Sequence, residues 1–244
     1  MQSFDIINSY YNGVVNLVGD IIMILYGSTA YGVKTSDLDV CFVCDNNLST
    51  ENFEKLKNYT HEFHKEKCLR IDEEIPYDNK MIYTHEFITD TFNNSPFPYN
   101  NGKYVIPDII KSKEFLCSLQ MKKRLLLNIL TVKNKVIGSA AEKEIIEDYT
   151  NKAWDIILKT VISYSEKSIL TFDEIYQLLY SNPFNGNSGE MYLGYKDNLK
   201  EKLEFIRTKL TKQLTKLIYE NKIEKTLSKK YIPNERWLNN EKYN

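Results

Sequence analysis

Apolar residues recur in two different periods along the first part of the chain. From residue 2 to residue 18 they lie three or four positions apart, which predicts an amphipathic helix ending near Gly19. The run from Ile21 to Tyr26 is short, contains β-branched residues and stops at Gly27, so it predicts a buried strand. The next segments predict a strand, a surface helix and a third strand over residues 37–44, 50–66 and 68–76.

The second part of the chain has the helical period in most of its segments. Asn, Pro and Gly residues between Thr84 and Pro107 predict a long irregular connection, with a domain boundary near its end. Three apolar stripes then predict helices, and a fourth follows an Asn- and Gly-rich loop; the stripes run over 115–130, 145–161, 172–179 and 199–218. We therefore expect an α/β (α+β) fold, with a small mixed sheet and flanking helices in residues 1–106 and an α-helical bundle in residues 107–244.

Composition narrows the class of protein. Hydrophobic residues make up 42% and charged residues 27% of the 244, which is typical of a soluble globular chain. No apolar run approaches the roughly 18 residues that cross a bilayer, and the first residues lack a secretory signal. We expect a cytoplasmic protein with no membrane partner, in which the four cysteines are reduced and mostly buried.

Charge is distributed unevenly along the chain. Residues 196–244 hold thirteen Lys and Arg against seven Asp and Glu, a charge of +6, whereas the rest of the chain carries −7. A basic tail can follow a phosphate backbone, but these lysines alternate with glutamates at helical spacing. That pattern favours a solvated helix face over a nucleic-acid interface.

One segment, ILYGSTAYGVKTSDLDVCFV at residues 24–43, combines features that carry chemistry. Alternate residues of a strand project to the same face, so Asp37 and Asp39 should present their carboxylates together while Leu38 points into the core. Such a pair suits Mg²⁺, which binds one or two carboxylates together with substrate phosphates. Gly27 permits a sharp turn close to a phosphate, to which Ser28 could donate a hydrogen bond.

This arrangement resembles the polymerase β-like nucleotidyltransferase superfamily, in which hydrophobic-Gly-Ser, a spacer and Asp-hydrophobic-Asp lie on successive strands. The resemblance covers residues 22–43 and implies a third carboxylate on a later strand. Asp72 in the segment LRIDEEI fits that role, and Glu74 on the same face is the fallback. By resemblance, Asp37, Asp39 and Asp72 are the catalytic residues and bind two Mg²⁺ ions.

The resemblance also implies the reaction and the nucleotide contacts. A hydroxyl of an acceptor would attack the α-phosphate of a nucleoside triphosphate, taken as ATP from its frequency in the superfamily, and pyrophosphate would leave. The residues expected to bind the nucleotide are Gly27, Ser28, Lys34 and Ser36. Tyr31 stands where many members have a basic residue, so phosphate charge must be balanced elsewhere, for which Lys34 is the candidate.

Two further groups of residues have competing interpretations. Cys41-x-x-Cys44 and His61-x-x-His64 loosely resemble a zinc finger, but cysteines three apart on a strand face opposite sides. Core thiols and a solvated helix face explain these four residues better. A second group, Glu142, Glu144 and Asp148, could supply a general base, but favourable charge at a helix N-terminus is the commoner explanation.

The sequence does not identify the acceptor of the nucleotide. A catalytic unit followed by a helical bundle resembles the layout of the antibiotic-type nucleotidyltransferases, so a hydroxyl-bearing small molecule is the first expectation. The alternative is nucleotidylation of a macromolecule, a protein or a tRNA, with the basic tail helping to dock it. A second alternative is an inactive binding module that retains the fold.

Overall fold

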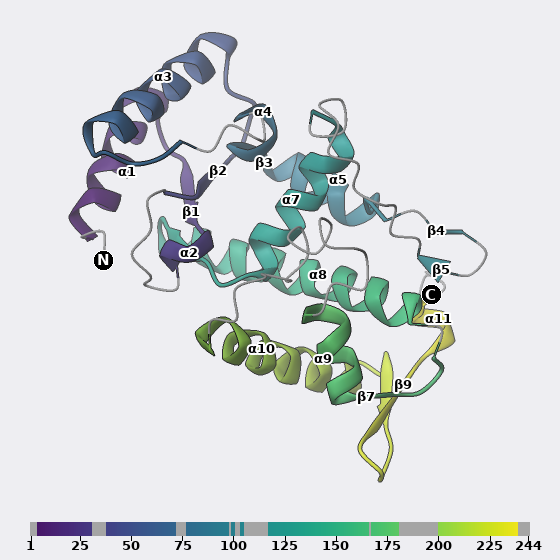
Figure 1. The fold of residues 1–244 in the computed structure, drawn as a ribbon. Helices are drawn as coiled ribbons and strands as arrows, with labels where there is room; N and C mark the ends of the chain where they lie inside the picture. The colour runs from purple at the N-terminus through teal and green to yellow at the C-terminus, as the bar shows by residue number, and fades with distance from the viewer. Residues whose placement is uncertain are drawn as a thin grey trace. The chain divides into compact units, whose positions relative to one another are not determined.

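A computed structural model of the chain describes most of its length (Figure 1). The described residues are 4–30, 38–71, 77–97, 99–100, 103–104, 117–165, 167–180 and 200–238. They form a mixed α and β structure, which confirms the expected fold class. Within these ranges, no helix combines the length and the apolar character needed to cross a membrane.

The chain divides into two compact units. The first comprises Met1–Asn94 and Lys111–Tyr149, and the second Ser95–Ile110 and Thr150–Asn244. The boundary expected between residues 106 and 107 lies outside the described residues. The first unit contains α1 (Phe4–Val18), β1 (Ile22–Leu25), α2 (Gly27–Ala30), β2 (Val40–Cys44), α3 (Thr50–Glu66), α4 (Tyr77–Lys80), β3 (Ile82–Thr84), α5 (His85–Asn93), α7 (Leu119–Thr131), β6 (Lys135–Ile137) and the start of α8 (Ala140–Tyr164).

A four-stranded mixed sheet organises the first unit. Its order is β3-β2-β1-β6, so the two strands that flank the glycine turn are the central ones. β1 pairs antiparallel with β2 and with β6, whereas β2 pairs parallel with β3. The sequence predicted β1 and β2 but neither β3 nor β6, because three-residue strands are too short to show a period.

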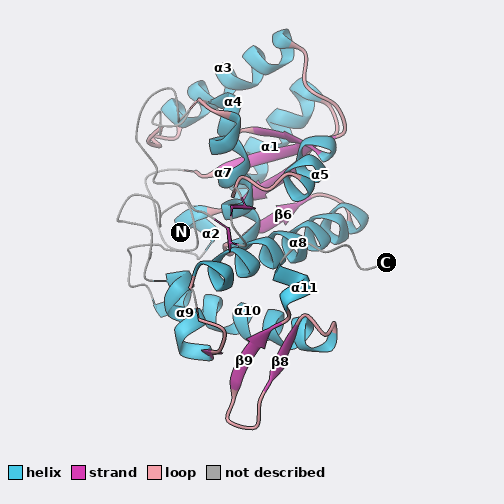
Figure 2. Cartoon of the chain, turned by 90° about the vertical axis from the view of Figure 1, so that its right-hand side faces the viewer, coloured by secondary structure: helices cyan, strands magenta, loops and turns pink. Residues whose placement is uncertain are grey.

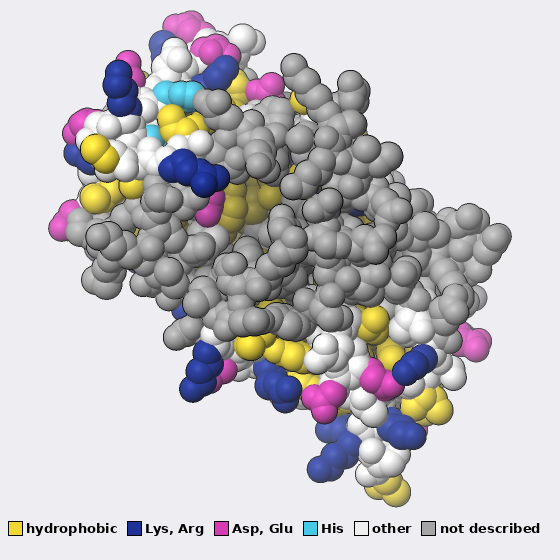
Figure 3. Space-filling model, in the orientation of Figure 1, with side chains coloured by type: hydrophobic (Ala, Val, Ile, Leu, Met, Phe, Trp, Pro, Cys, Tyr) yellow, Lys and Arg dark blue, Asp and Glu magenta, His cyan; other side chains and the backbone are white. Residues whose placement is uncertain are grey.

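The core of this unit forms where α1 and α3 meet one face of the sheet. Every residue of β1 and β2 is buried, which explains why both strands appear in the sequence as continuous apolar runs. Tyr10 of α1 stacks on Tyr59 of α3 at 5.7 Å between ring centroids, and its hydroxyl lies 2.8 Å from Thr60 Oγ1. On the outer face of α3, acidic and basic side chains are interspersed (Figure 3), as in the pair Lys55–Glu51.

Helix α3 and helix α5 show how local signals set the ends of elements. Residues 50–66 form α3 as predicted, capped by the Ser49 side chain, which accepts a hydrogen bond from Asn52 N at 3.2 Å. The irregular connection predicted from Thr84 is wrong over residues 85–93, where Thr84 caps α5 in the same way. The Asn93-Asn94 breaker marks the end of this helix.

The second unit joins helices to two small antiparallel sheets. Its described elements are β4 (Tyr99–Asn100), β5 (Lys103–Tyr104), the rest of α8, β7 (Leu170–Thr171), α9 (Phe172–Tyr180), α10 (Lys200–Tyr219), β8 (Ile223–Lys225), β9 (Lys230–Pro233) and α11 (Glu235–Leu238). The predicted helices correspond to α7, α8, α9 and α10, but α7 and the start of α8 belong to the first unit and not to a separate helical domain. The predicted loop 181–194 lies outside the described residues. The sheet β7-β9-β8 was not predicted, and Figure 2 shows β8 and β9 as a projecting hairpin.

Leu56 tests whether packing between α3 and the sheet holds the first unit together. Its side chain is fully buried in the core cluster, so Leu56→Ala should lower the free energy of unfolding by about 2–5 kcal/mol. Lys55→Ala on the exposed face of the same helix should change it by about 0.5 kcal/mol or less. Urea unfolding followed by circular dichroism measures both, and equal losses would contradict this account of the core.

Candidate functional site

The turn after β1 brings Gly27 and Asp39 together. β1 and β2 pair with Leu25 opposite Val40, and the Tyr26 amide donates to the Asp39 carbonyl oxygen at 3.0 Å. Gly27 follows with a φ of +66°, in the left-handed region that favours glycine. A Cβ atom at Gly27 would lie 2.0 Å from Asp39 Oδ2. The carboxylate therefore occupies the space that a side chain at residue 27 would need.

Asp39 alternates with core residues, as the sequence predicted. Leu38 and Val40 are 5% and 7% exposed, whereas Asp39 between them is partly exposed. Burial of its neighbours on both sides fixes the direction of the Asp39 side chain. The carboxylate is thus held at the start of β2, beside the first residue of α2.

Several residues predicted for this site cannot be placed. Asp37 and Asp72, the other two predicted metal ligands, lie outside the described residues, as do Lys34, Ser36 and Glu74. The structure describes the backbone of Ser28 in α2 but not its side chain. Of the predicted site, the structure therefore brings Gly27 and Asp39 together.

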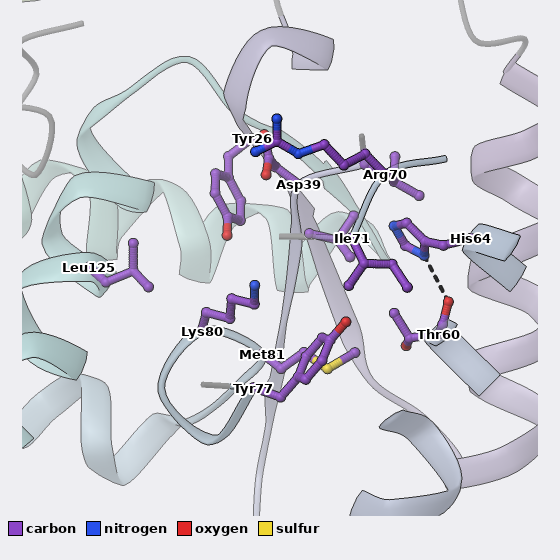
Figure 4. A pocket seen from close by; sticks show the side chains of 12 residues that line it. Tyr26, Asp39, Thr60, His64, Arg70, Ile71, Tyr77, Lys80, Met81 and Leu125 are labelled. Atoms are coloured by element: carbon purple, nitrogen blue, oxygen red, sulfur yellow. Dashed lines mark hydrogen bonds between the residues drawn. The ribbon is translucent and has the colours of Figure 1, made fainter. Parts of the chain in front are cut away.

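A cavity of about 130 Å³ opens in front of Asp39. Its described walls come from the ends of β1 and β2, from α3 and the segment after it, from α4 and from α7. Figure 4 shows the lining, with the Lys80 ammonium group and the Tyr26 hydroxyl directed toward each other and the Arg70 guanidinium beside the Asp39 carboxylate. The lining residues are Tyr26, Leu38, Asp39, Val40, Thr60, His64, Arg70, Ile71, Tyr77, Lys80, Met81 and Leu125.

The end of α3 determines where Arg70 lies. Cys68 has a φ of +53°, and the Leu69 amide donates to the His64 carbonyl oxygen at 2.7 Å. A left-handed residue with such a six-to-one hydrogen bond reverses the chain after a helix, and glycine usually occupies that position. Because this position holds a cysteine, the sequence contained no signal of the turn. Residues 68–76 were predicted as a strand, but in the described part only Arg70 makes an isolated β-bridge.

His64 belongs to the cavity and not to a solvated helix face, which corrects the interpretation of the His61-x-x-His64 pair. It is 5% exposed, and its Nδ1 lies 2.8 Å from the Thr60 carbonyl oxygen. A carbonyl oxygen only accepts, so Nδ1 carries the proton. The Tyr10 ring packs edge-on against the imidazole at 6.2 Å, which fixes the orientation of the ring.

The zinc interpretation of the cysteines finds no support in the geometry. Cys41 and Cys44 are buried free thiols, as expected, and the core cluster on one face of the sheet includes Cys44 but not Cys41. Burial raises the pKa of both thiols, most strongly that of Cys41. Cys68 and Cys117 are exposed, so the expectation of burial is wrong for these two.

Glu142 has the structural role that the sequence favoured. Its Oε2 accepts from the Ser139 amide at 2.6 Å, and the Ser139 hydroxyl accepts from the Glu142 amide at 3.3 Å. This reciprocal pair is a capping box at the start of α8, and the bonds to Ser139 lower the Glu142 pKa. Glu144 and Asp148 instead line an open depression with His85 and Asp45. Asp45 follows the last residue of β2, whereas Asp39 precedes the first.

Asp39 is the one predicted metal ligand that lies in the described part of the chain. Mg²⁺ prefers carboxylate oxygens, and Asp39 supplies them at the edge of the cavity. Among the residues whose side chains are described, no group of three or more His, Cys, Asp or Glu residues could hold a metal ion. Asp37 and Asp72 stay the predicted further ligands.

Comparisons with models of known protein families, with curated proteins and with solved structures found no match to this chain. The interpretation of the site therefore rests on its residues, their geometry and the resemblance of residues 22–43 to the superfamily motif.

Gly27→Ala tests the contact between the turn and the carboxylate. A side chain at a left-handed φ costs about 1–2 kcal/mol, and here the Cβ would also displace the Asp39 carboxylate. Gly19→Ala is the matched control, because Gly19 has a φ of +86° with nothing within 4 Å of its Cβ position. We expect a larger loss of unfolding free energy in G27A than in G19A.

The second arm of this experiment removes the obstructing carboxylate. Asp39→Ala introduced into G27A should recover most of the excess loss, because Oδ2 and Cγ are the nearest obstructing atoms. Chemical unfolding of the single and double variants measures the coupling. Additive losses would show that Gly27 and Asp39 do not meet.

Proposed function

We propose that this chain is a metal-dependent nucleotidyltransferase that transfers a nucleoside monophosphate from a nucleoside triphosphate to an acceptor hydroxyl. The observation that carries the proposal is the Asp39 carboxylate packed against the left-handed Gly27 turn at the edge of a cavity. The missing side chain at Gly27 lets the Asp39 carboxylate lie against the backbone of the turn, and the carboxylate would supply oxygen for a cation that the phosphates of a nucleotide share. The motif spacing in residues 22–43 supports the same assignment.

Asp39, with Asp37 and Asp72, would hold Mg²⁺ in this proposal. Two such ions, when bound, would neutralise charge on the entering and leaving oxygens of an in-line displacement at phosphorus. The chain's own contribution is to fix the position of Asp39 between two buried neighbours and to make room for its carboxylate at Gly27, which has no side chain. Fixed carboxylates need little rearrangement during the reaction, which lowers its barrier.

The acceptor in the first form of the proposal is a hydroxyl-bearing small molecule, with ATP as the nucleotide. The overall order of the chain, a sheet-containing unit followed by mainly helical segments, supports this choice through its resemblance to antibiotic-type enzymes. The layout alone does not define chemistry, since one fold serves many acceptors. Assay with each α-labelled nucleotide and a panel of acceptors, followed by detection of pyrophosphate, would identify both substrates.

A macromolecular acceptor is the second candidate, and the β8–β9 hairpin favours it. Lys225, Lys229 and Lys230 are exposed on this hairpin, and the Leu227 side chain at its tip is fully exposed. Figure 3 shows basic side chains gathered there. Exposed lysines on a projecting hairpin could contact a phosphate backbone or an acidic protein surface.

Replacement of Asp39 by Asn tests the proposed activity. The amide keeps the shape of the carboxylate but removes its charge, so we expect D39N to lose nucleotidyl transfer by at least about a hundredfold while its thermal unfolding midpoint changes little. Asp37→Asn combined with D39N should abolish transfer. The readout is pyrophosphate release with Mg²⁺ and α-labelled nucleotide.

Asp45→Asn is the matched control for D39N. Asp45 follows the same strand at its other end, and its side chain is 91% exposed, so the variant should retain wild-type turnover. If D39N retained turnover at the level of D45N, the assignment of Asp39 would be refuted. Absence of Mg²⁺-dependent nucleotide binding by calorimetry in the wild type would instead favour an inactive binding module.

Neutralisation of the hairpin separates the two acceptor classes. The triple variant K225Q/K229Q/K230Q should lose modification of a tRNA or acidic protein acceptor by about tenfold or more if that surface docks it, because several charge contacts disappear together. Transfer to a small-molecule acceptor should be unchanged. Equal activity of the variant and the wild type on every macromolecular acceptor tested would exclude the hairpin from docking.

A further inference from the structure

Two cationic side chains are among the described residues that line the cavity next to Asp39. Arg70 and Lys80 contribute two cationic groups, whereas Asp39 contributes one carboxylate. The Arg70 guanidinium lies beside Asp39, and the Lys80 ammonium projects into the space from α4 (Figure 4). Two cations that line one concave space can bind an anionic ligand together, because the walls of a cleft focus the field of its charges.

The two cations reach the cavity from different parts of the first unit. Arg70 follows the reversal at Cys68, which the hydrogen bond from Leu69 to His64 closes. Lys80 lies in the single turn of α4, with its Nζ 5.0 Å from the centroid of the Tyr77 ring. Arg70 is exposed and Lys80 is half-buried, and each lines the cavity from its own element.

We infer that Arg70 and Lys80 form an anion subsite that binds the pyrophosphate part of the nucleoside triphosphate, and afterwards the pyrophosphate product. This inference rests on the proposed function, because it places these cations beside the carboxylate that would hold the metal. Arginine suits such a role, since its planar group donates two parallel hydrogen bonds to phosphate oxygens. Arg70 and Lys80 would balance the negative charge of the phosphates, which a tyrosine at position 31 does not do.

The subsite makes a prediction that does not depend on metal or turnover. The full chain in EDTA at low ionic strength should bind inorganic pyrophosphate, measured by isothermal titration calorimetry, and added salt should weaken the binding. Arg70→Gln and Lys80→Gln should each weaken it by about tenfold or more, because each removes a charge-assisted hydrogen bond. Lys55→Gln, in an exposed pair with Glu51 on α3, should change the affinity less than about twofold.

Two further variants exclude a purely structural role. Arg70→Lys keeps the charge, so it should recover part of the affinity lost in R70Q. D39N should increase metal-free pyrophosphate affinity by about threefold or more, because it removes a negative charge beside the subsite. If Arg70 served only to pair with Asp39, R70Q would lower thermal stability without changing pyrophosphate binding, and the inference would be overturned.

The inference and the proposed function can fail separately. Suppose that the chain binds pyrophosphate without metal through Arg70 and Lys80 but transfers no nucleotide in any acceptor assay. The subsite would then stand, and the proposed enzymatic function would be refuted. Suppose instead that nucleotide transfer depends on Asp39, but R70Q and K80Q bind pyrophosphate as tightly as the wild type. The proposed function would then stand, and the subsite would be overturned. Absence of pyrophosphate binding by the wild type in EDTA would also overturn it.

Discussion

The contact between the Gly27 backbone and the Asp39 carboxylate is the constraint on which the candidate site depends. Antiparallel pairing of β1 with β2 places residue 39 opposite Tyr26, directly before the turn. Glycine satisfies two demands there at once, since the backbone has a positive φ and the carboxylate occupies the space of a side chain. A polar side chain is thereby held at the end of two fully buried strands, where it meets the cavity and not the core.

The sheet and its covering helices turn this contact into a rigid site. Buried Leu38 and Val40 anchor the backbone on either side of Asp39, so the carboxylate has few alternatives to its position. Helix α3 contributes His64, whose ring is held by the Thr60 carbonyl oxygen, and its reversed end carries Arg70. The cavity walls are thus built from elements that pack independently of any ligand, which is the usual basis of preorganisation.

The sequence predicted those features that a period or a motif expresses. α3, α8, α10 and the two central strands have enough residues to show their spacing, and the glycine turn before Asp39 follows from a local motif. β3 and β6 are three residues long, so their pairing is decided by neighbours distant in sequence. Cys68 concealed the reversal that directs Arg70, because a left-handed residue at a helix end is normally predicted from glycine. The cavity lining could not be predicted either, since it joins residues that are up to about a hundred positions apart.

The charges around Asp39 explain how one cavity could serve a metal-bound polyanion. A carboxylate alone would repel the phosphates of a nucleotide, and cations alone would compete with Mg²⁺. Arg70 and Lys80 line the same cavity as Asp39. Under the proposed function, the carboxylate would hold the cation while the basic groups contact phosphate oxygens. Arg70 next to Asp39 would also compensate the carboxylate when no metal is bound, because a partly buried charge is costly without a partner. Under the proposed function, Arg70 would therefore pair with the carboxylate in the free protein and with a phosphate in the complex.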